Sequence, residues 1–312
     1  MPNSLKKSLW LLSLPLVVML LSGCTIPGTD IEIPGLPDFF GSTTVEYEND
    51  ILVIKSLQAI PAEVSPGQTV TIIATIQNKG TQRIPMSELN VELYDYCPGL
   101  FSITKPMELP KGDLYPEQMI QLTWRLKASN DVAVESVCPS DGMKLAVWYP
   151  HETEAIATIA FIDEAEKNRL IQEGKYGQTS SQVTVGEGPV KPYIEIRDSQ
   201  PIASNSGTTN IVFQVRNRGN GFIKRDQNDP INPVVSWVLV GSSDSTMARD
   251  LEACRKEHEG KFVLIGGKSA ELPCIITVPK KQKTEYTETI TTKISYWYEF
   301  RKNVIVKVKP KS

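Results

Sequence analysis

The segment Gln118-Met119-Ile120-Gln121-Leu122-Thr123-Trp124-Arg125-Leu126 alternates polar and apolar side chains along most of its length. Its apolar members from Ile120 to Leu126 fall on one face of an extended chain, because successive side chains of a strand point to opposite sides. This pattern is typical of an antiparallel strand that buries one face. The segment Thr69–Gln77 shows the same alternation, so we predict an all-β fold.

Residues 51–162 contain about seven segments of this type, separated by turn signals such as Ser65-Pro66-Gly67 and Asn78-Lys79-Gly80. Short strands at this spacing predict a β-sandwich domain. We expect a turn at Pro150 and His151 between the last two strands. The named strands are Ile51–Ile60, Thr69–Gln77, Glu88–Tyr96, Gln118–Leu126, Met143–Tyr149 and Ala155–Ile162.

A short helix is predicted at Asp163–Tyr176. Asp163 can cap its first turn, and Glu166 stands three residues later, as in a capping box. Glu, Lys, Leu and Gln fill the interior, and all of them favour helix. With the polar residues that follow, residues 163–189 form a connector between two domains.

Residues 190–312 repeat the first domain. Asn217-Arg218-Gly219 corresponds to Asn78-Lys79-Gly80, and Lys293–Tyr298 corresponds to Lys144–Tyr149. A duplicated unit is the economical interpretation of such self-similarity. The chain therefore reads as two sandwiches in tandem.

The second copy carries an insertion at Ser242–Gly260. Its less polar side chains recur at helical spacing and so share one face of a helix. Members of this face are Met247, Leu251, Cys254 and His258. We therefore predict a helical insertion whose Cys254 points into the second domain.

The chain has five cysteines. Cys24 belongs to an N-terminal motif described below, and the other four are an even number, as a disulfide framework requires. None lies in a C-x-x-C motif, so the pattern does not indicate zinc or thioredoxin chemistry. The simplest pairing stays within each half, Cys97 with Cys138 and Cys254 with Cys274.

Residues 1–23 have the features of an export signal. Lys6 and Lys7 precede the apolar run Leu9–Leu21, which is shorter than the roughly 20 residues of a membrane-spanning helix. The stretch Leu21-Ser22-Gly23-Cys24 resembles the lipobox of prokaryotic lipoproteins. This resemblance implies cleavage before Cys24, lipid attachment to its sulfur, and anchoring on the extracytoplasmic face of the cell membrane.

Residues 24–50 are rich in proline and glycine, which indicates an extended tether. After it, Pro66-Gly67-Gln68-Thr69-Val70 with Asn78-Lys79-Gly80 resembles immunoglobulin-like modules of archaeal and bacterial surface proteins. The nearest type is the bacterial cell-adhesion-related (CARDB-like) domain. Ser206-Gly207 with Asn217-Arg218-Gly219 matches more loosely, because the second copy lacks the Pro-Gly pair. The resemblance implies two immunoglobulin-like sandwiches that act as spacers or binding platforms.

The formal net charge is −3, and removal of residues 1–23 deletes two lysines, leaving 31 basic against 36 acidic residues, or −5. We find no basic stripe, so nucleic acid is not an expected partner. Only His151 and His258 are present, one in each half, which gives no cluster for zinc or a catalytic triad. We therefore expect neither enzymatic activity nor a cofactor.

An acidic loop and a repeated aromatic pair are the remaining candidates for a site. Asp226, Asn228 and Asp229 could hold a cation, but the loop lacks the glycine and distal glutamate of an EF-hand. We interpret it as a solvated turn and expect no metal. Trp148 and Trp297 are equivalent in the repeat, and we expect them in a core or on a sheet face rather than in a sugar site.

These features favour a lipid-anchored extracytoplasmic protein that acts as a structural or adhesion-type binding module. Its partners would be the membrane, through the anchor, and a protein or cell-surface polymer. The alternative is an accessory subunit of an integral-membrane transport or secretion complex.

Overall fold

The computed structural model describes residues 49–137, 141–178, 181–204, 206–224, 233–280 and 284–310. From Asn49 onward these residues belong to one compact unit, Glu46–Ser312. The fold is all-β and consists of immunoglobulin-like β-sandwich layers, as predicted. Within the described ranges the helices are α2 (Glu164–Gln172) and α3 (Ser245–Glu257), and neither is long and apolar enough to cross a membrane.

One group of strands, which we call the first sandwich, follows the alternation seen in the sequence. In β8 every second residue is buried, including Leu122 and Trp124. One of its sheets has the order β1 (Leu52–Ile60), β3 (Thr69–Asn78), β8 (Met119–Ala128) and β6 (Phe101–Lys105). Its other sheet contains β5 (Asn90–Tyr94), the first part of β10 (Met143–Ile162) and the last part of β19 (Glu285–Val304). Shorter strands are β2 (Glu63–Val64), β4 (Ile84–Pro85), β7 (Asp113–Leu114), β9 (Ser136–Val137) and β20 (Lys307–Val308).

The remaining strands form what we call the second sandwich. One sheet has the order β12 (Val190–Ile196), β14 (Thr208–Asn217) and β18 (Ser269–Thr277). The other contains β11 (Gln182–Val185), the last part of β10, the first part of β19, β16 (Val234–Ser242) and β17 (Lys261–Val263). Two short strands, β13 (Ile202–Ala203) and β15 (Phe222–Ile223), add to β10 and β19.

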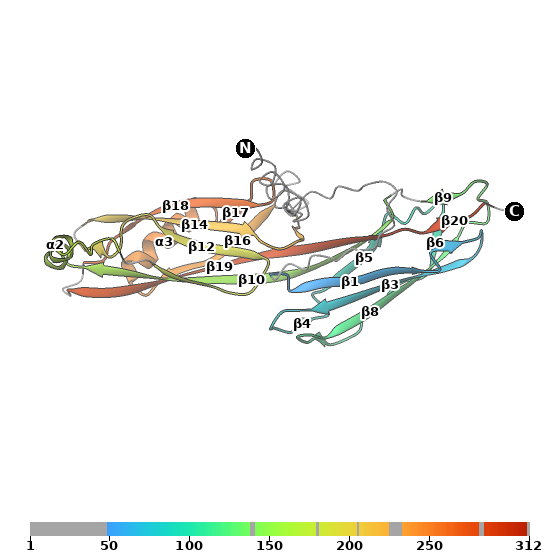
Figure 1. Ribbon diagram of the computed structural model, residues 1–312, viewed down its shortest axis with the longest axis horizontal. Helices are drawn as coiled ribbons and strands as arrows, with labels where there is room; N and C mark the ends of the chain where they lie inside the picture. Colours follow the sequence, from blue (N-terminus) through green and yellow to red (C-terminus); the bar gives the residue numbers. More distant parts are fainter. Residues whose placement is uncertain are drawn as a thin grey trace, which may run out of the picture. The chain divides into compact units, whose positions relative to one another are not determined.

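The two sandwiches share β10 and β19. These 20-residue strands pair antiparallel without a break, from Met143 opposite Val304 to Ile162 opposite Glu285 (Figure 1). On its other side β10 first pairs with β5, at Lys144–Trp148, and later with β11, at Ala155–Thr158. Each long strand therefore begins in one sandwich and ends in the other.

Equivalent residues of the repeat meet at the middle of this pairing. Tyr149 lies opposite Tyr298, its counterpart in the other copy, and Trp148 and Trp297 flank them at equivalent positions. An antiparallel strand pair has a local twofold axis perpendicular to its strands. The internal repeat is thus arranged about a pseudo-twofold axis between Tyr149 and Tyr298.

The structure differs from the sequence prediction at Pro150 and His151, where β10 continues and no turn occurs. A proline without an N–H is tolerated because β10 has a strand partner on only one side there. The predicted ranges 51–162 and 190–312 are consequently not self-contained. Each sandwich contains a strand segment from the range predicted for the other. The two sandwiches are therefore joined by these strands as well as by the predicted connector.

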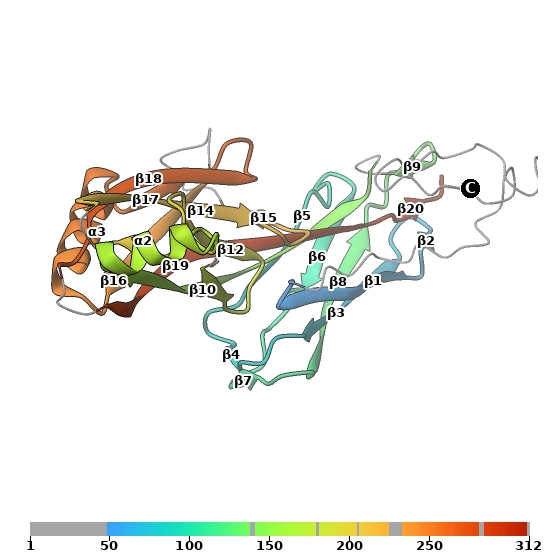
Figure 2. The same cartoon turned by 60° about the vertical axis from the view of Figure 1, so that its left-hand side comes forward.

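Both predicted helices are present. Asp163 caps α2 by accepting a hydrogen bond from the Glu166 N–H at 2.7 Å. Helix α3 packs against β16 and β18 (Figure 2) and buries Met247, Leu251 and Cys254 on one face, as expected.

Helix α3 also occupies an edge that a strand covers in the first sandwich. There, β6 pairs with the end of β8. In the second sandwich no described strand pairs with the outer edge of β18, and α3 lies beside it. The Asp250 carboxylate accepts a hydrogen bond from the Thr277 N–H at 2.9 Å, which satisfies an edge donor that would otherwise be exposed.

Shared strands predict that both sandwiches unfold together. Leu122→Ala removes a fully buried side chain from the first sandwich and should cost about 2–5 kcal/mol. The unfolding transition is followed by the fluorescence of a buried tryptophan, either Trp124 in the first sandwich or Trp237 in the second, in two variants that each retain one of the two. We expect Leu122→Ala to lower the urea midpoint equally in both variants. An unchanged Trp237 transition would show that the two sandwiches unfold independently.

Candidate functional site

Several residues singled out from the sequence lie outside the described residues. They are Cys24, Cys138, Asp226, Asn228 and Asp229. The lipid attachment, the Cys97–Cys138 pairing and the cation loop therefore stay predictions. Cys97 itself, just after β5, takes part in a disulfide bond. Among the described residues no group of three or more His, Cys, Asp and Glu side chains is placed to hold a metal ion.

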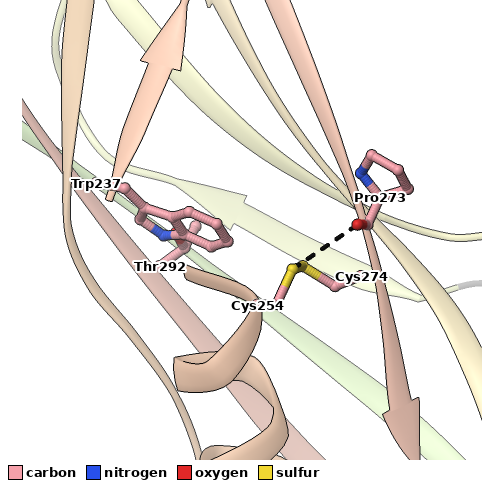
Figure 3. The surroundings of a disulfide bond; sticks show 5 residues. All are labelled: Trp237, Cys254, Pro273, Cys274 and Thr292. Atoms are coloured by element: carbon pink, nitrogen blue, oxygen red, sulfur yellow. Dashed lines mark hydrogen bonds between the residues drawn. A yellow bond between two sulfur atoms is a disulfide. The ribbon is translucent and has the colours of Figure 1, made fainter. Parts of the chain in front are cut away.

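The predicted pairing of Cys254 with Cys274 is present in the structure. Both side chains are buried, and the bond joins α3 to β18 beside the indole of Trp237 (Figure 3). The Cys254 Sγ also lies 3.7 Å from the Pro273 carbonyl oxygen. This is a packing contact, because a disulfide sulfur has no proton to donate. The bond fixes the inserted helix over the open edge of β18.

Replacing both cysteines by alanine should lower the free energy of unfolding by about 3 kcal/mol, because the bond closes a loop with a sequence separation of 20 residues. Urea unfolding of the oxidised wild type and the double variant measures the loss. Adding reductant should destabilise the wild type further than the variant. Equal stability of the two proteins under oxidising conditions would contradict this role.

The two Asn-x-Gly motifs form matching turns, which we call the first corner (Asn78–Gln82) and the second corner (Asn217–Gly221). In the first corner the Asn78 Nδ2 donates to the Gln82 carbonyl at 2.7 Å, and its Oδ1 accepts from the Gly80 N–H at 2.9 Å. In the second corner the Asn217 side chain makes the same two bonds, to the Gly221 carbonyl at 3.0 Å and from the Gly219 N–H at 3.2 Å. These motifs therefore shape the backbone at equivalent places.

Each corner is held by a carboxylate that precedes the first long strand of the other sandwich. Asp50, just before β1, accepts from the Asn220 N–H of the second corner at 3.2 Å. Glu187, just before β12, accepts from the N–H and hydroxyl of Thr81 in the first corner, at 3.0 and 2.6 Å. The two carboxylates thus connect the sandwiches reciprocally. Neither carboxylate can be singled out from the sequence, because an acidic residue before a strand forms no recognisable pattern.

The environments of these two carboxylates differ. Glu187 is exposed, whereas Asp50 is buried, and burial raises the pKa of Asp50 to about 6. The Asn220 N–H and the charge of Lys79 oppose this shift but do not cancel it. A Cβ at Gly219 would lie 2.2 Å from the Asp50 Oδ1, so the close approach requires glycine at this position.

The raised pKa makes stability depend on pH. Between about pH 4 and pH 6 the folded state retains a proton on Asp50 that the unfolded state releases, so stability falls as the pH rises through this window. In Asp50→Asn the side chain can still accept from Asn220 but carries no charge. We expect this part of the decline, on the order of 1–3 kcal/mol, to disappear in urea unfolding measured from pH 4 to pH 8.

The matched control is Glu187→Gln, which makes the same change at the equivalent but exposed position. It should alter stability by less than about 0.5 kcal/mol at any pH in the series. A pH profile of Asp50→Asn that coincides with that of the wild type would contradict the assignment.

The two histidines lie in different settings. His151 packs edge-on between Tyr149 and Tyr296, with ring centroids 6.1 and 5.8 Å away, and its Nε2 is 3.1 Å from the Glu187 carbonyl oxygen. Burial lowers the pKa of His151. His258 ends α3 as its C-cap residue. The His151 side chain therefore packs between aromatic rings, whereas His258, the fourth member of the predicted helix face, ends the helix through its backbone and is only half-buried.

The equivalent tryptophans lie on the outer face of the shared sheet, one of the two placements expected. Trp148 is half-buried beneath Lys224, whose Nζ is 3.3 Å from the ring centroid. Trp297 is 45% exposed. Phe222 of β15 is 56% exposed and lies opposite Glu299. The middle of this face therefore presents aromatic surface to solvent.

The fold and these contacts define an all-β protein of immunoglobulin-like sandwich architecture. No family model matches the chain, and no curated protein matches it. Among solved structures the chain is similar to a collagen adhesin from S. aureus, at 10% identity, covering 83% of this chain and 93% of that chain. The TM-score is 0.11, which is too low to support any conclusion about fold or binding.

Proposed function

We propose that this chain is an extracytoplasmic lipoprotein, anchored to the cell membrane through Cys24, whose sandwiches act as a structural or adhesion-type binding module. The observation that carries the proposal is the stretch Leu21-Ser22-Gly23-Cys24 directly after a short apolar run. Stable anchoring by lipid alone takes more than one acyl chain. The mature protein is therefore expected to carry at least two.

Two structural features support this proposal. The Cys254–Cys274 disulfide suits an oxidising, extracytoplasmic compartment. The exposed aromatic side chains of Trp297 and Phe222 lie on one sheet face, and aromatic residues are enriched at binding interfaces.

Metabolic labelling with a fatty-acid precursor tests the anchor. The wild-type chain should incorporate label and sediment with membranes, whereas Cys24→Ala should do neither, because it lacks the sulfur that forms the thioether. Ser22→Ala is the matched control, since it keeps a small residue before the cysteine, and it should label like the wild type. Lipid incorporation into Cys24→Ala would refute the proposal.

A further inference from the structure

The second corner encloses a pocket of about 420 Å³. Its lining includes Gly219 and Gly221 of the corner, Phe222 of β15, and the turn residues Gly266–Lys268. The second corner can be compared residue by residue with the first corner, because the two share the same backbone hydrogen bonds. The Asn78 N–H donates to the Gln118 carbonyl at 3.1 Å, and the Asn217 N–H donates to the Lys268 carbonyl at 2.8 Å.

Polar side chains occupy the equivalent place in the first corner. The Glu117 carboxylate accepts from the Gln77 Nε2 at 2.9 Å, and Arg83 pairs with Asp113 at 2.7 Å. Since Lys268 corresponds to Gln118 in these two hydrogen bonds, Gly267 corresponds to Glu117. Both residues have left-handed backbone, with φ of 60° for Glu117 and 72° for Gly267. The second copy thus keeps the turn but lacks the carboxylate side chain that the first copy carries there.

Two basic residues of the described part of the chain lie at or beside the pocket, whereas the buried Asp50 carboxylate at this corner already accepts the Asn220 N–H. Lys268 lines it, and Arg218 lies between two of its lining residues, Asn217 and Gly219. Both are exposed, and neither forms an ion pair with any residue that the structure describes. The nearby carboxylate of Glu299 is buried and already paired with Arg301. The net charge of the chain is negative. One cation that lines the pocket and a second that is adjacent to it in sequence, neither of them in an ion pair with a described residue, therefore favour an anionic ligand here.

Phe222 joins the pocket to the outer face of the shared sheet. It lines the pocket and is 56% exposed, and it lies opposite Glu299 on β19, two residues from the exposed Trp297. A ligand longer than one unit could therefore continue from the pocket along the aromatic surface. Flat aromatic rings suit the apolar faces of sugar rings, while cations suit carboxylates.

We propose that the second corner binds a carboxylated sugar polymer. Lys268 and Arg218 bind its carboxylates, and Phe222 packs against a sugar ring. This inference rests on the proposed function in one respect, the extracytoplasmic location, since cell-surface polymers lie outside the cytoplasm. The binding chemistry itself is independent of the lipid anchor.

The test uses the full mature chain in mild detergent, titrated with polygalacturonate, neutral dextran and poly-L-glutamate by calorimetry and tryptophan fluorescence. Polygalacturonate should bind, more weakly as salt is raised, and dextran should not. The Arg218→Ala/Lys268→Ala double variant should weaken binding at least about tenfold, equivalent to about 1.4 kcal/mol. Phe222→Ala should also weaken it, with an unchanged urea midpoint because the side chain is largely exposed.

The matched control is Arg125→Ala/Lys127→Ala, which removes two exposed cations from the outer face of β8 and should leave binding within about twofold. An equal loss in this control would show attraction by overall charge and overturn the site. Equal binding of poly-L-glutamate would indicate an acidic protein partner and overturn the sugar assignment, as would failure of polygalacturonate to bind at low salt. Lipid labelling at Cys24 is unaffected by any of these outcomes, so failure of this site is distinguishable from failure of the proposed function.

Discussion

The antiparallel pairing of β10 with β19 is the interaction on which the rest of the structure depends. It places Tyr149 opposite Tyr298 and gives each sandwich a strand segment that begins in the other. Neither sandwich could close its second sheet without that segment. A sheet interrupted there would expose unpaired backbone groups and part of the apolar face that it covers. The duplicated sequence therefore produces one continuous structure instead of two separate domains joined only by a linker.

The carboxylates at the corners reinforce the same arrangement from the loops. Asp50 and Glu187 reach from the start of one sandwich to a backbone N–H of the other. Their energetic roles differ because one is buried and the other is exposed. A net gain of about 1.5–3 kcal/mol is typical of a hydrogen bond to a charged group, but a buried carboxylate also loses hydration. The repeat is thus symmetric in backbone geometry and asymmetric in electrostatics.

Local patterns in the sequence predicted the local structure well. The alternation at Ile120–Leu126, the cap at Asp163 and the buried face of α3 all appear as expected, because each depends on residues close together in the chain. The continuity of β10 through Pro150 could not be predicted in this way. It depends on pairing with β19, more than a hundred residues away, and proline ordinarily marks the end of a strand.

The candidate sites likewise divide into those that local sequence patterns predict and those that depend on residues far apart in the chain. The Cys254–Cys274 bond could be predicted, because helical spacing and strand alternation put both side chains on inward faces. The pocket at the second corner could not be predicted, because residues from separate parts of the chain line it and a glycine such as Gly267 leaves no side-chain pattern in the sequence. Sequence patterns predict buried side chains more readily than they predict pockets.

Asp50 has a mechanical consequence as well as an electrostatic one. It stands immediately before β1 of the first sandwich while its carboxylate binds the backbone of the second. A pull on the chain that precedes it would be transmitted through the backbone to one sandwich and through the carboxylate to the other. Tension would thus be divided between them at its point of entry, and protonation of this single carboxyl group would change how the load is shared.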